Sequence, residues 1–205
     1  MGRMKFAVTP EFDVGGTVFR PEQLVLLGSL VGEDAKIEMT TFKQLYVEMQ
    51  EESAEEVKEQ LRAIGLDIQP TGFYTKNLIA CNFCKGAEEA GLQIAKDLDE
   101  AIAGQETPSP LKIGYAGCAL GTSEPLLKDI AVVKMRDSFD IYVGGEAKGL
   151  KAVLAQLFMS GVDEEQLIPI VRRMVQYYQE KGKNKEKFLR FIERIGLVSL
   201  KETVA

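Results

Sequence analysis

The chain has 205 residues and a mass of 22.7 kDa, enough for one or two domains with a sizeable core. Its 31 acidic and 25 basic residues give a formal net charge of −6, which argues against a general nucleic-acid-binding protein. Histidine is absent, which excludes Ser–His and Cys–His nucleophiles and histidine-ligated zinc. No apolar run approaches the ~18–20 residues of a membrane helix, and the start lacks a signal-peptide pattern. We therefore expect a cytoplasmic protein with no membrane or nucleic-acid partner.

The first third of the chain predicts a small unit of mixed strands and helices. Weak alternation of apolar and polar residues over 5–8 predicts a strand. A glycine turn follows, and a proline at the first helical position then predicts a helix over residues 21–31. Alternating apolar residues predict strands over 36–39 and 43–49. A capping-box pattern then predicts a helix over 53–65. The expected order is β-α-β-β-α.

Proline and glycine within residues 69–72 predict a domain boundary, with domains over 1–70 and 71–205. Apolar spacing in the second domain predicts helices over 86–104, 146–159, 163–181 and 184–194, and strands over 111–115, 130–133 and 139–143. This order favours an α/β arrangement for the second domain. The chain as a whole is predicted to be α+β.

All three cysteines lie at junctions between predicted elements. Cys81 and Cys84 form a C-x-x-C pair, and Cys118 follows the predicted strand over 111–115. In a reducing compartment an odd number of cysteines indicates free thiols, soft-metal ligands or a redox pair. Cys84 is expected at the mouth of the helix over 86–104, whose N-terminus would favour the thiolate. The alternative is that one or more of the three is a buried small hydrophobic residue.

Glycine turns occur along the chain, but none has the spacing of a nucleotide-binding loop. Thr122 and Ser123, which follow Gly121, offer hydroxyl and backbone N–H donors that suit an anion. A simple turn is the alternative at this position.

Several motifs, in the same order along the chain, resemble the nitrite and sulfite reductase family, whose members hold a sirohaem coupled to a 4Fe–4S cluster. Residues 15–24 and 36–41 resemble its ferredoxin-like half-domain. Its cluster-and-sirohaem domain is resembled by residues 80–87, 116–118, 129–133, 141–145 and 188–196. The resemblance implies a ferredoxin-like half-domain followed by an α/β domain of the 4Fe–4S and sirohaem type.

The family's cluster is held by two cysteines separated by five residues and, later, two separated by three. Cys84 matches the second cysteine of the first pair, with Leu78 at the position of the first. Cys118 matches the first cysteine of the second pair, with Thr122 at the position of the last, which in the family links cluster and sirohaem. With Cys81 as a third ligand, the resemblance implies a metal site of three cysteines. The fourth ligand is left to a hydroxyl, water, substrate or another subunit.

The resemblance also implies sirohaem as a cofactor. The residues that correspond to its binding site are Thr41, Lys43, Gln44, Thr122 and Ser123. Lys43 stands where the family tends to place an arginine, so it keeps the charge but lacks the bidentate fork. No residue is assigned a catalytic role.

The function implied is that of a redox protein that receives electrons from a donor protein and passes them to a small oxyanion such as sulfite or nitrite. The alternative is a catalytically degenerate family member that serves as a binding or regulatory subunit. Intact reductases contain this two-part module twice, whereas the chain contains it once. The resemblance therefore implies a homodimer, or pairing with an intact reductase subunit.

Overall fold

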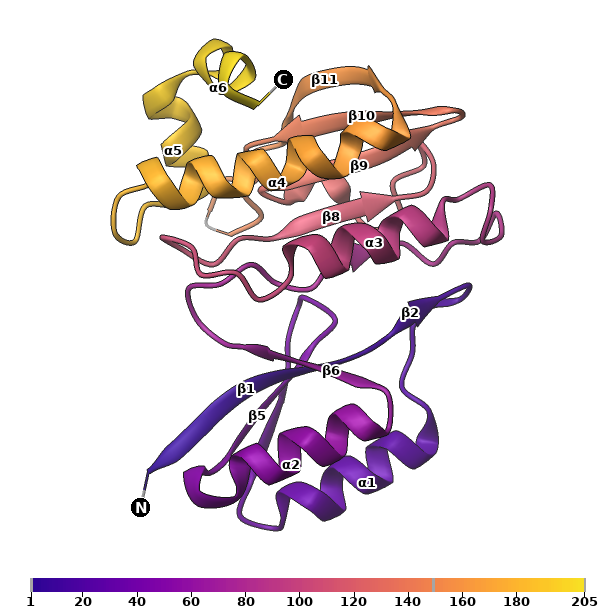
Figure 1. The fold of residues 1–205 in the computed structure, drawn as a ribbon, viewed down its shortest axis with the longest axis vertical. Helices are drawn as coiled ribbons and strands as arrows, with labels where there is room; N and C mark the ends of the chain where they lie inside the picture. The colour runs from indigo at the N-terminus through magenta and orange to yellow at the C-terminus, as the bar shows by residue number, and fades with distance from the viewer. Residues whose placement is uncertain (1, 149, 205) are drawn as a thin grey trace. The chain divides into compact units, whose positions relative to one another are not determined.

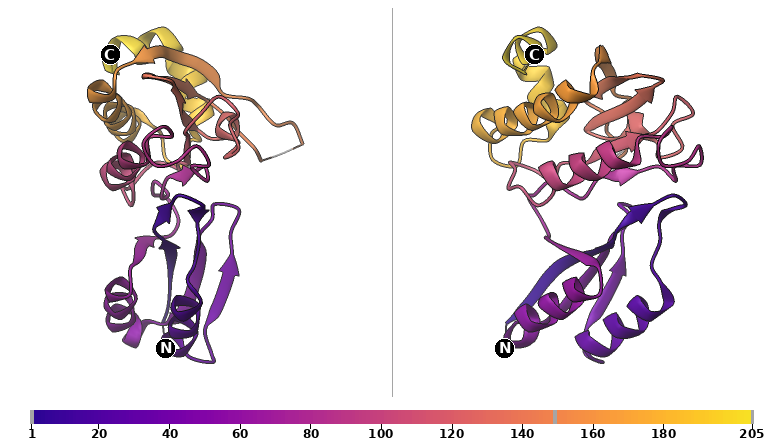
Figure 2. Two further views of the ribbon diagram at one scale, coloured as in Figure 1. Left: turned by 90° about the vertical axis from the view of Figure 1, so that its right-hand side faces the viewer. Right: turned by 45° about the vertical axis from the view of Figure 1, so that its right-hand side comes forward.

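The computed structural model describes residues 2–148 and 150–204, and the chain divides into two compact units, Met1–Thr71 and Gly72–Ala205 (Figures 1 and 2). Each unit contains both strands and helices, which confirms the α+β fold class. Among the described residues, no helix combines the length and the apolar character needed to cross a membrane.

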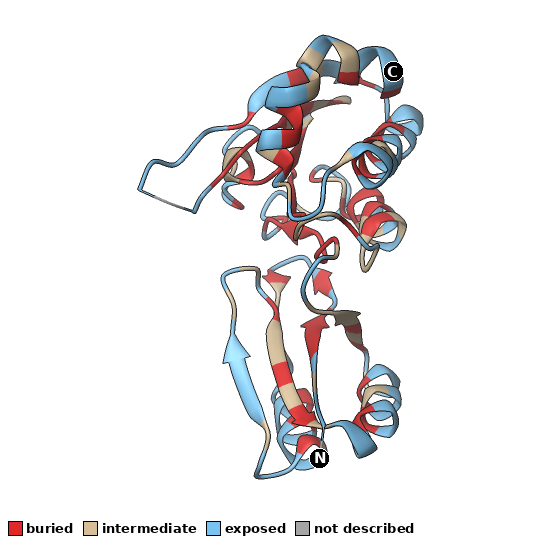
Figure 3. Ribbon diagram, turned by 90° about the vertical axis from the view of Figure 1, so that its left-hand side faces the viewer, coloured by how far each residue is buried: buried red, intermediate tan, exposed pale blue. Residues whose placement is uncertain are grey.

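The first unit is an antiparallel sheet with two helices. Its sheet has the order β4-β5-β1-β6 and consists of β1 (Arg3–Pro10), β4 (Lys36–Met39), β5 (Leu45–Gln50) and β6 (Leu66–Pro70). The remaining elements are the hairpin of β2 (Phe12–Asp13) and β3 (Gly16–Thr17), and the helices α1 (Pro21–Val31) and α2 (Glu51–Ala63). Strand β4 lies at the sheet edge and is exposed along its length (Figure 3).

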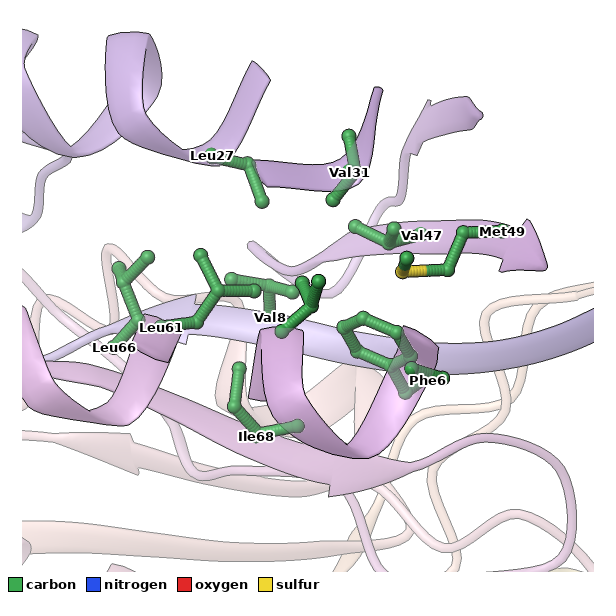
Figure 4. Packing of buried hydrophobic residues seen from close by; sticks show 11 residues of the cluster. Phe6, Val8, Leu27, Val31, Val47, Met49, Leu61, Leu66 and Ile68 are labelled. Carbon is green, nitrogen blue, oxygen red and sulfur yellow. The ribbon is translucent and has the colours of Figure 1, made fainter. Parts of the chain in front are cut away.

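The core of the first unit lies between the sheet and the two helices (Figure 4). Residues two apart along a strand point to the same face, so Phe6 and Val8 of β1 face the helices together. The same face carries Val47 and Met49 of β5, and the helices contribute Leu27, Val31, Val57 and Leu61. The single apolar face explains why both helices pack on one side of the sheet.

Helix α1 begins at the predicted proline, whereas α2 begins earlier than predicted. The Arg20 amide donates to Gln23 Oε1 at 3.0 Å, which caps α1. Helix α2 starts at Glu51, directly after β5, and places the predicted cap Ser53 inside its first turn. Acidic residues in that turn favour the helix N-terminus, so a hydroxyl cap is not required. Strand β6 was not predicted, and its last two residues, Gln69 and Pro70, pair with β1 inside the predicted boundary segment.

The second unit is a mixed sheet with the order β11-β10-β9-β8-β7. Its strands are β7 (Ile79–Ala80), β8 (Ile113–Ala116), β9 (Ile130–Met135), β10 (Ser138–Val143) and β11 (Gln156–Val162). Strands β7, β8 and β9 are parallel, and β10 and β11 continue the sheet in antiparallel pairing. The other elements are α3 (Leu92–Ile102), the short 3-10 helix η1 (Pro125–Leu127), α4 (Glu164–Lys181), α5 (Phe188–Ile195) and α6 (Leu197–Val204).

The helix predicted over residues 146–159 is wrong. Residues 156–162 form β11, which pairs with β10 at the sheet edge, and Glu146 and Val153 form an isolated bridge before it. The leucines that suggested a helical face are exposed, with Leu150 fully exposed and Leu154 at 61%. Because those side chains join no core, backbone pairing with β10 decides the structure of this segment.

Candidate functional site

Two of the cysteines follow neighbouring parallel strands. Strand β7 pairs with β8 so that Ala80 lies opposite Tyr115. The carboxyl ends of parallel strands meet at one edge of a sheet, where α/β proteins usually place their ligands. Cys81 directly follows β7, and its amide donates to the Tyr115 carbonyl at 3.0 Å. Cys118 emerges beside it, two residues beyond the end of β8.

The three cysteines line one small cavity at this edge, which we call the cysteine cavity. Its wall comes from the loop after β7 and the loop after β8. The residues that form it are Cys81, Phe83, Cys84, Lys85, Ala90, Ala116, Gly117, Cys118 and Thr122. All the thiols of the chain therefore lie at a single site.

The thiols differ in exposure from the inner end of the cavity to its mouth. Cys81 is buried, Cys118 is half-buried, and Cys84 is exposed. The Gly117 amide donates to Cys81 Sγ at 3.2 Å. This hydrogen bond connects the loop after β8 to the side chain of Cys81.

Phe83 fixes the loop between the first two cysteines. Its φ of 48° is left-handed, a conformation that is uncommon for an aromatic residue. The ring is fully buried and stacks on Tyr115, with the two ring centroids 5.9 Å apart. The buried ring therefore holds Cys81 and Cys84 in place on either side of it.

Tyr115 connects the two loops of the site. Its hydroxyl donates toward the carbonyl oxygens of Ala90 and Gly91, at 2.9 and 3.1 Å. Burial raises the pKa of Tyr115, so this hydroxyl stays protonated and remains a donor at neutral pH. The hydrogen bonds tie the end of the first cysteine loop to β8.

The predicted position of Cys84 at a helix N-terminus is wrong. Helix α3 begins only at Leu92, and residues 84–91 form turns. Gly86 and Gly91 have left-handed φ values of 91° and 69°, which interrupt the apolar helical spacing of this segment. No helix end therefore assists the Cys84 thiol.

Leu78, at the position of the family's first cysteine, does not line the cysteine cavity. It is buried, and its amide donates to Asp99 Oδ1 at 2.7 Å. Cys81 lies at the end of β7 and occupies the cavity wall instead.

The two hydroxyl residues predicted after Gly121 have different surroundings. Thr122 is exposed and lines the cysteine cavity. Ser123 is 5% exposed, and its hydroxyl donates to the Tyr115 carbonyl at 2.8 Å. The Ser123 hydroxyl therefore holds its own loop against β8 and is not presented to a ligand.

The other three predicted sirohaem-binding residues belong to the first unit, in the turn between β4 and β5. Thr41 and Lys43 are exposed, and Lys43 has a left-handed φ of 59°. Gln44 is 1% exposed. Thr40 organises the turn, since its hydroxyl donates to the Gln44 carbonyl at 2.7 Å.

Three residues that shape the site were not predicted from the sequence: Phe83, Tyr115 and Gly117. The signal for Gly117 was its place directly before Cys118. A Cβ atom at position 117 would lie 2.6 Å from Ala90 Cβ and 2.7 Å from the Ala90 carbonyl oxygen. Only glycine therefore allows the two loops to approach so closely.

The three thiols are the only strong soft-metal donors among the described residues in the wall of the cysteine cavity. Within residues 2–148 and 150–204, no three His, Cys, Asp or Glu side chains converge as ligands of one metal ion. In a 4Fe–4S cluster each cysteine binds a different iron, so the sulfur atoms surround the cluster. The wall of the cysteine cavity offers three thiols and the hydroxyl of Thr122, one thiol fewer than the four cysteines that usually hold such a cluster.

Comparisons with known proteins show which family the chain resembles. The family profile described as "Nitrite and sulphite reductase 4Fe-4S domain" matches residues 75–205. A cobalt-factor III methyltransferase of Priestia megaterium is 28% identical over 86% of this chain and 33% of its own length. An assimilatory-type sulfite reductase of Nitratidesulfovibrio vulgaris is 21% identical over 77% of this chain and 72% of its own length.

Solved structures show the same fold over nearly the whole chain. The NirA protein of Mycobacterium tuberculosis has a TM-score of 0.74 and 13% identity, and covers 98% of this chain and 39% of its own. Dissimilatory sulfite reductase I has a TM-score of 0.71 and 14% identity, and covers 98% of this chain and 70% of its own. Because the profile matches more than half of the sequence, the chain belongs to the nitrite and sulphite reductase 4Fe-4S domain family.

Proposed function

We propose that the protein is a one-electron carrier whose second unit holds a 4Fe–4S cluster through Cys81, Cys84 and Cys118. The observation that carries the proposal is the single cavity lined by all three thiols. When bound, such a cluster accepts and donates one electron at a potential set by its surroundings. The Gly117 N–H donor would stabilise the more negative, reduced state.

We propose that these electrons serve the reduction of a small oxyanion such as nitrite or sulfite. Support comes from the family and from relatives that include a nitrite reductase [NAD(P)H] and an assimilatory nitrate reductase electron transfer subunit, both of Bacillus subtilis. The chain spans 18% and 14% of those two proteins, and a third of the cobalt-factor III methyltransferase. The partner is accordingly a redox protein or a larger reductase component.

Sirohaem is supported by fewer residues than the cluster. Thr41 and Lys43 are exposed on the first unit, where a hydroxyl and an ammonium group suit the carboxylates of a sirohaem. Ser123 is committed to the Tyr115 carbonyl and Gln44 is buried, so neither fits the role that the resemblance implies. The proposal therefore rests on the iron–sulfur centre, and a sirohaem titration of wild type against Lys43→Ala tests the second cofactor separately.

The test is a reversible redox titration of the anaerobically reconstituted protein. Wild type should take up iron and sulfide, lose visible absorption on reduction with dithionite, and give a paramagnetic signal that disappears on reoxidation. Each single Cys→Ser variant should take up less iron and sulfide than wild type. The variant with all three substitutions has no thiol left and measures iron bound at random.

Iron uptake by wild type no greater than that of the triple variant would refute the proposal. It would leave the alternative of a degenerate subunit that binds or regulates a reductase without a cofactor of its own.

A further inference from the structure

One residue in the wall of the cysteine cavity is an exposed threonine. Thr122 lines the cavity together with the three thiols, and it is exposed, as is Cys84. Its loop is held from both sides, because the Gly121 amide donates to the Cys118 carbonyl at 3.2 Å and Ser123 is tied to Tyr115. Thr122 therefore sits at a defined position at the mouth of the cavity.

No other residue of the cavity wall supplies a strong ligand for iron. A threonine hydroxyl stays protonated near neutral pH, whereas iron–sulfur clusters select soft thiolate ligands. The remaining wall residues are apolar apart from Lys85, whose ammonium group donates to Glu89 Oε1 at 2.9 Å. The chain has no histidine and no fourth cysteine.

We propose that the cluster is bound at three irons only, and that the iron at Thr122 takes an exchangeable ligand from outside the chain. This inference rests on the proposed function. An external thiolate is the expected ligand, because it is the soft donor that the protein itself fails to provide. The cluster would thus combine electron transfer with an open coordination position at the mouth of the cavity.

An iron without a protein ligand is labile on oxidation. Ferricyanide removes one electron from the [4Fe–4S]²⁺ state, and the resulting [4Fe–4S]³⁺ state releases one Fe²⁺ to give [3Fe–4S]⁺, so that charge and iron balance. The product has a paramagnetic signal of its own, and the free Fe²⁺ is counted with a chelator. In wild type we expect about one iron released per cluster and the [3Fe–4S]⁺ signal.

Three variants test the role of position 122. Thr122→Cys adds the missing thiolate and should suppress iron release several-fold. Thr122→Val should release iron as wild type does, because the hydroxyl is not the ligand. Leu120→Cys is the matched control, since it adds an exposed thiol to the same loop away from the cavity wall, and it should behave as wild type.

A small thiol, 2-mercaptoethanol, serves as the external probe. It should shift the paramagnetic spectrum of the reduced wild-type cluster and leave that of Thr122→Cys unchanged.

The outcomes separate the two proposals. Failure of wild type to assemble any cluster refutes the proposed function. A cluster that assembles but keeps all its iron under ferricyanide, in wild type and in Thr122→Cys alike, overturns the inference alone. Loss of the cluster in Thr122→Val also overturns it, because the hydroxyl would then be a ligand.

Discussion

Truncation of Phe83 should separate the stability of the second unit from its capacity to bind iron. The Phe83 ring is fully buried, stacks on Tyr115 and lies between two proposed ligands. Phe83→Ala removes the ring and leaves a cavity, at a cost of about 3–5 kcal/mol of unfolding free energy. Because the free energy of unfolding of a domain is about 5–15 kcal/mol, this variant should still fold, with a smaller free energy of unfolding than wild type.

Phe139→Ala is the matched control. Phe139 is also fully buried, and its ring centroid lies 6.5 Å from that of Tyr115. It belongs to β10 and not to a cysteine loop. Both variants should lose similar stability in urea denaturation. Only Phe83→Ala should take up less iron on reconstitution, since only it frees the loop that carries Cys81 and Cys84.

Phe83→Leu and Phe139→Leu repeat the comparison with a smaller cavity, should either alanine variant fail to fold. Equal iron uptake by the Phe83 and Phe139 variants, at equal stability, would refute the claim that the buried ring positions the ligands.

Three further changes are predicted to have measurable effects. Gly117→Ala places a Cβ 2.6 Å from the Ala90 Cβ. It should lower the unfolding free energy in urea by about 1–3 kcal/mol, and it should also lower iron uptake. Gly28→Ala is the control and should lower neither, because a Cβ there would meet nothing within 4 Å. Burial raises the pKa of Asp129 from 3.8 to about 6, so its contribution to stability is present below 3.8 and lost as pH rises through 6. Relative to Asp129→Asn, wild type should lose about 2 kcal/mol between pH 4 and pH 7, and parallel profiles would contradict this. Hydrogen bonds from Arg194 lower the pKa of Glu186 to about 2, so that contribution is present above about 4.5 and lost as pH falls toward 2. Arg194→Gln should therefore move acid unfolding to higher pH, as followed by circular dichroism.

Much of the first unit could be predicted from local patterns. The proline at the start of α1 and the alternating residues of β5 act within a few positions of the chain, and the structure follows them. Strand β6 could not be predicted in the same way, because its place depends on pairing with the distant β1. The helix predicted over 146–159 failed for the same reason, since pairing with β10 outweighed the spacing of exposed leucines.

The cysteines of the candidate site could be picked out from the sequence, but the residues that hold their loops in place could not. The sequence showed three thiols at loop junctions and left free thiols, metal ligands, a redox pair and buried residues open, and only the family resemblance implied a three-cysteine metal site. The residues that hold the loops act through contacts between distant segments, as when Tyr115 donates to Ala90 and Gly117 packs against it. Such contacts depend on how the loops after β7 and β8 meet in space. They cannot be predicted from the spacing of residues along the chain.

The most direct test of the account is the iron and acid-labile sulfide content of the anaerobically reconstituted protein, measured beside the variant that lacks all three cysteines. We expect about four iron and four sulfide per chain in wild type, and only the background content in the variant. Equal, low contents in both proteins would contradict the claim that Cys81, Cys84 and Cys118 hold one cluster.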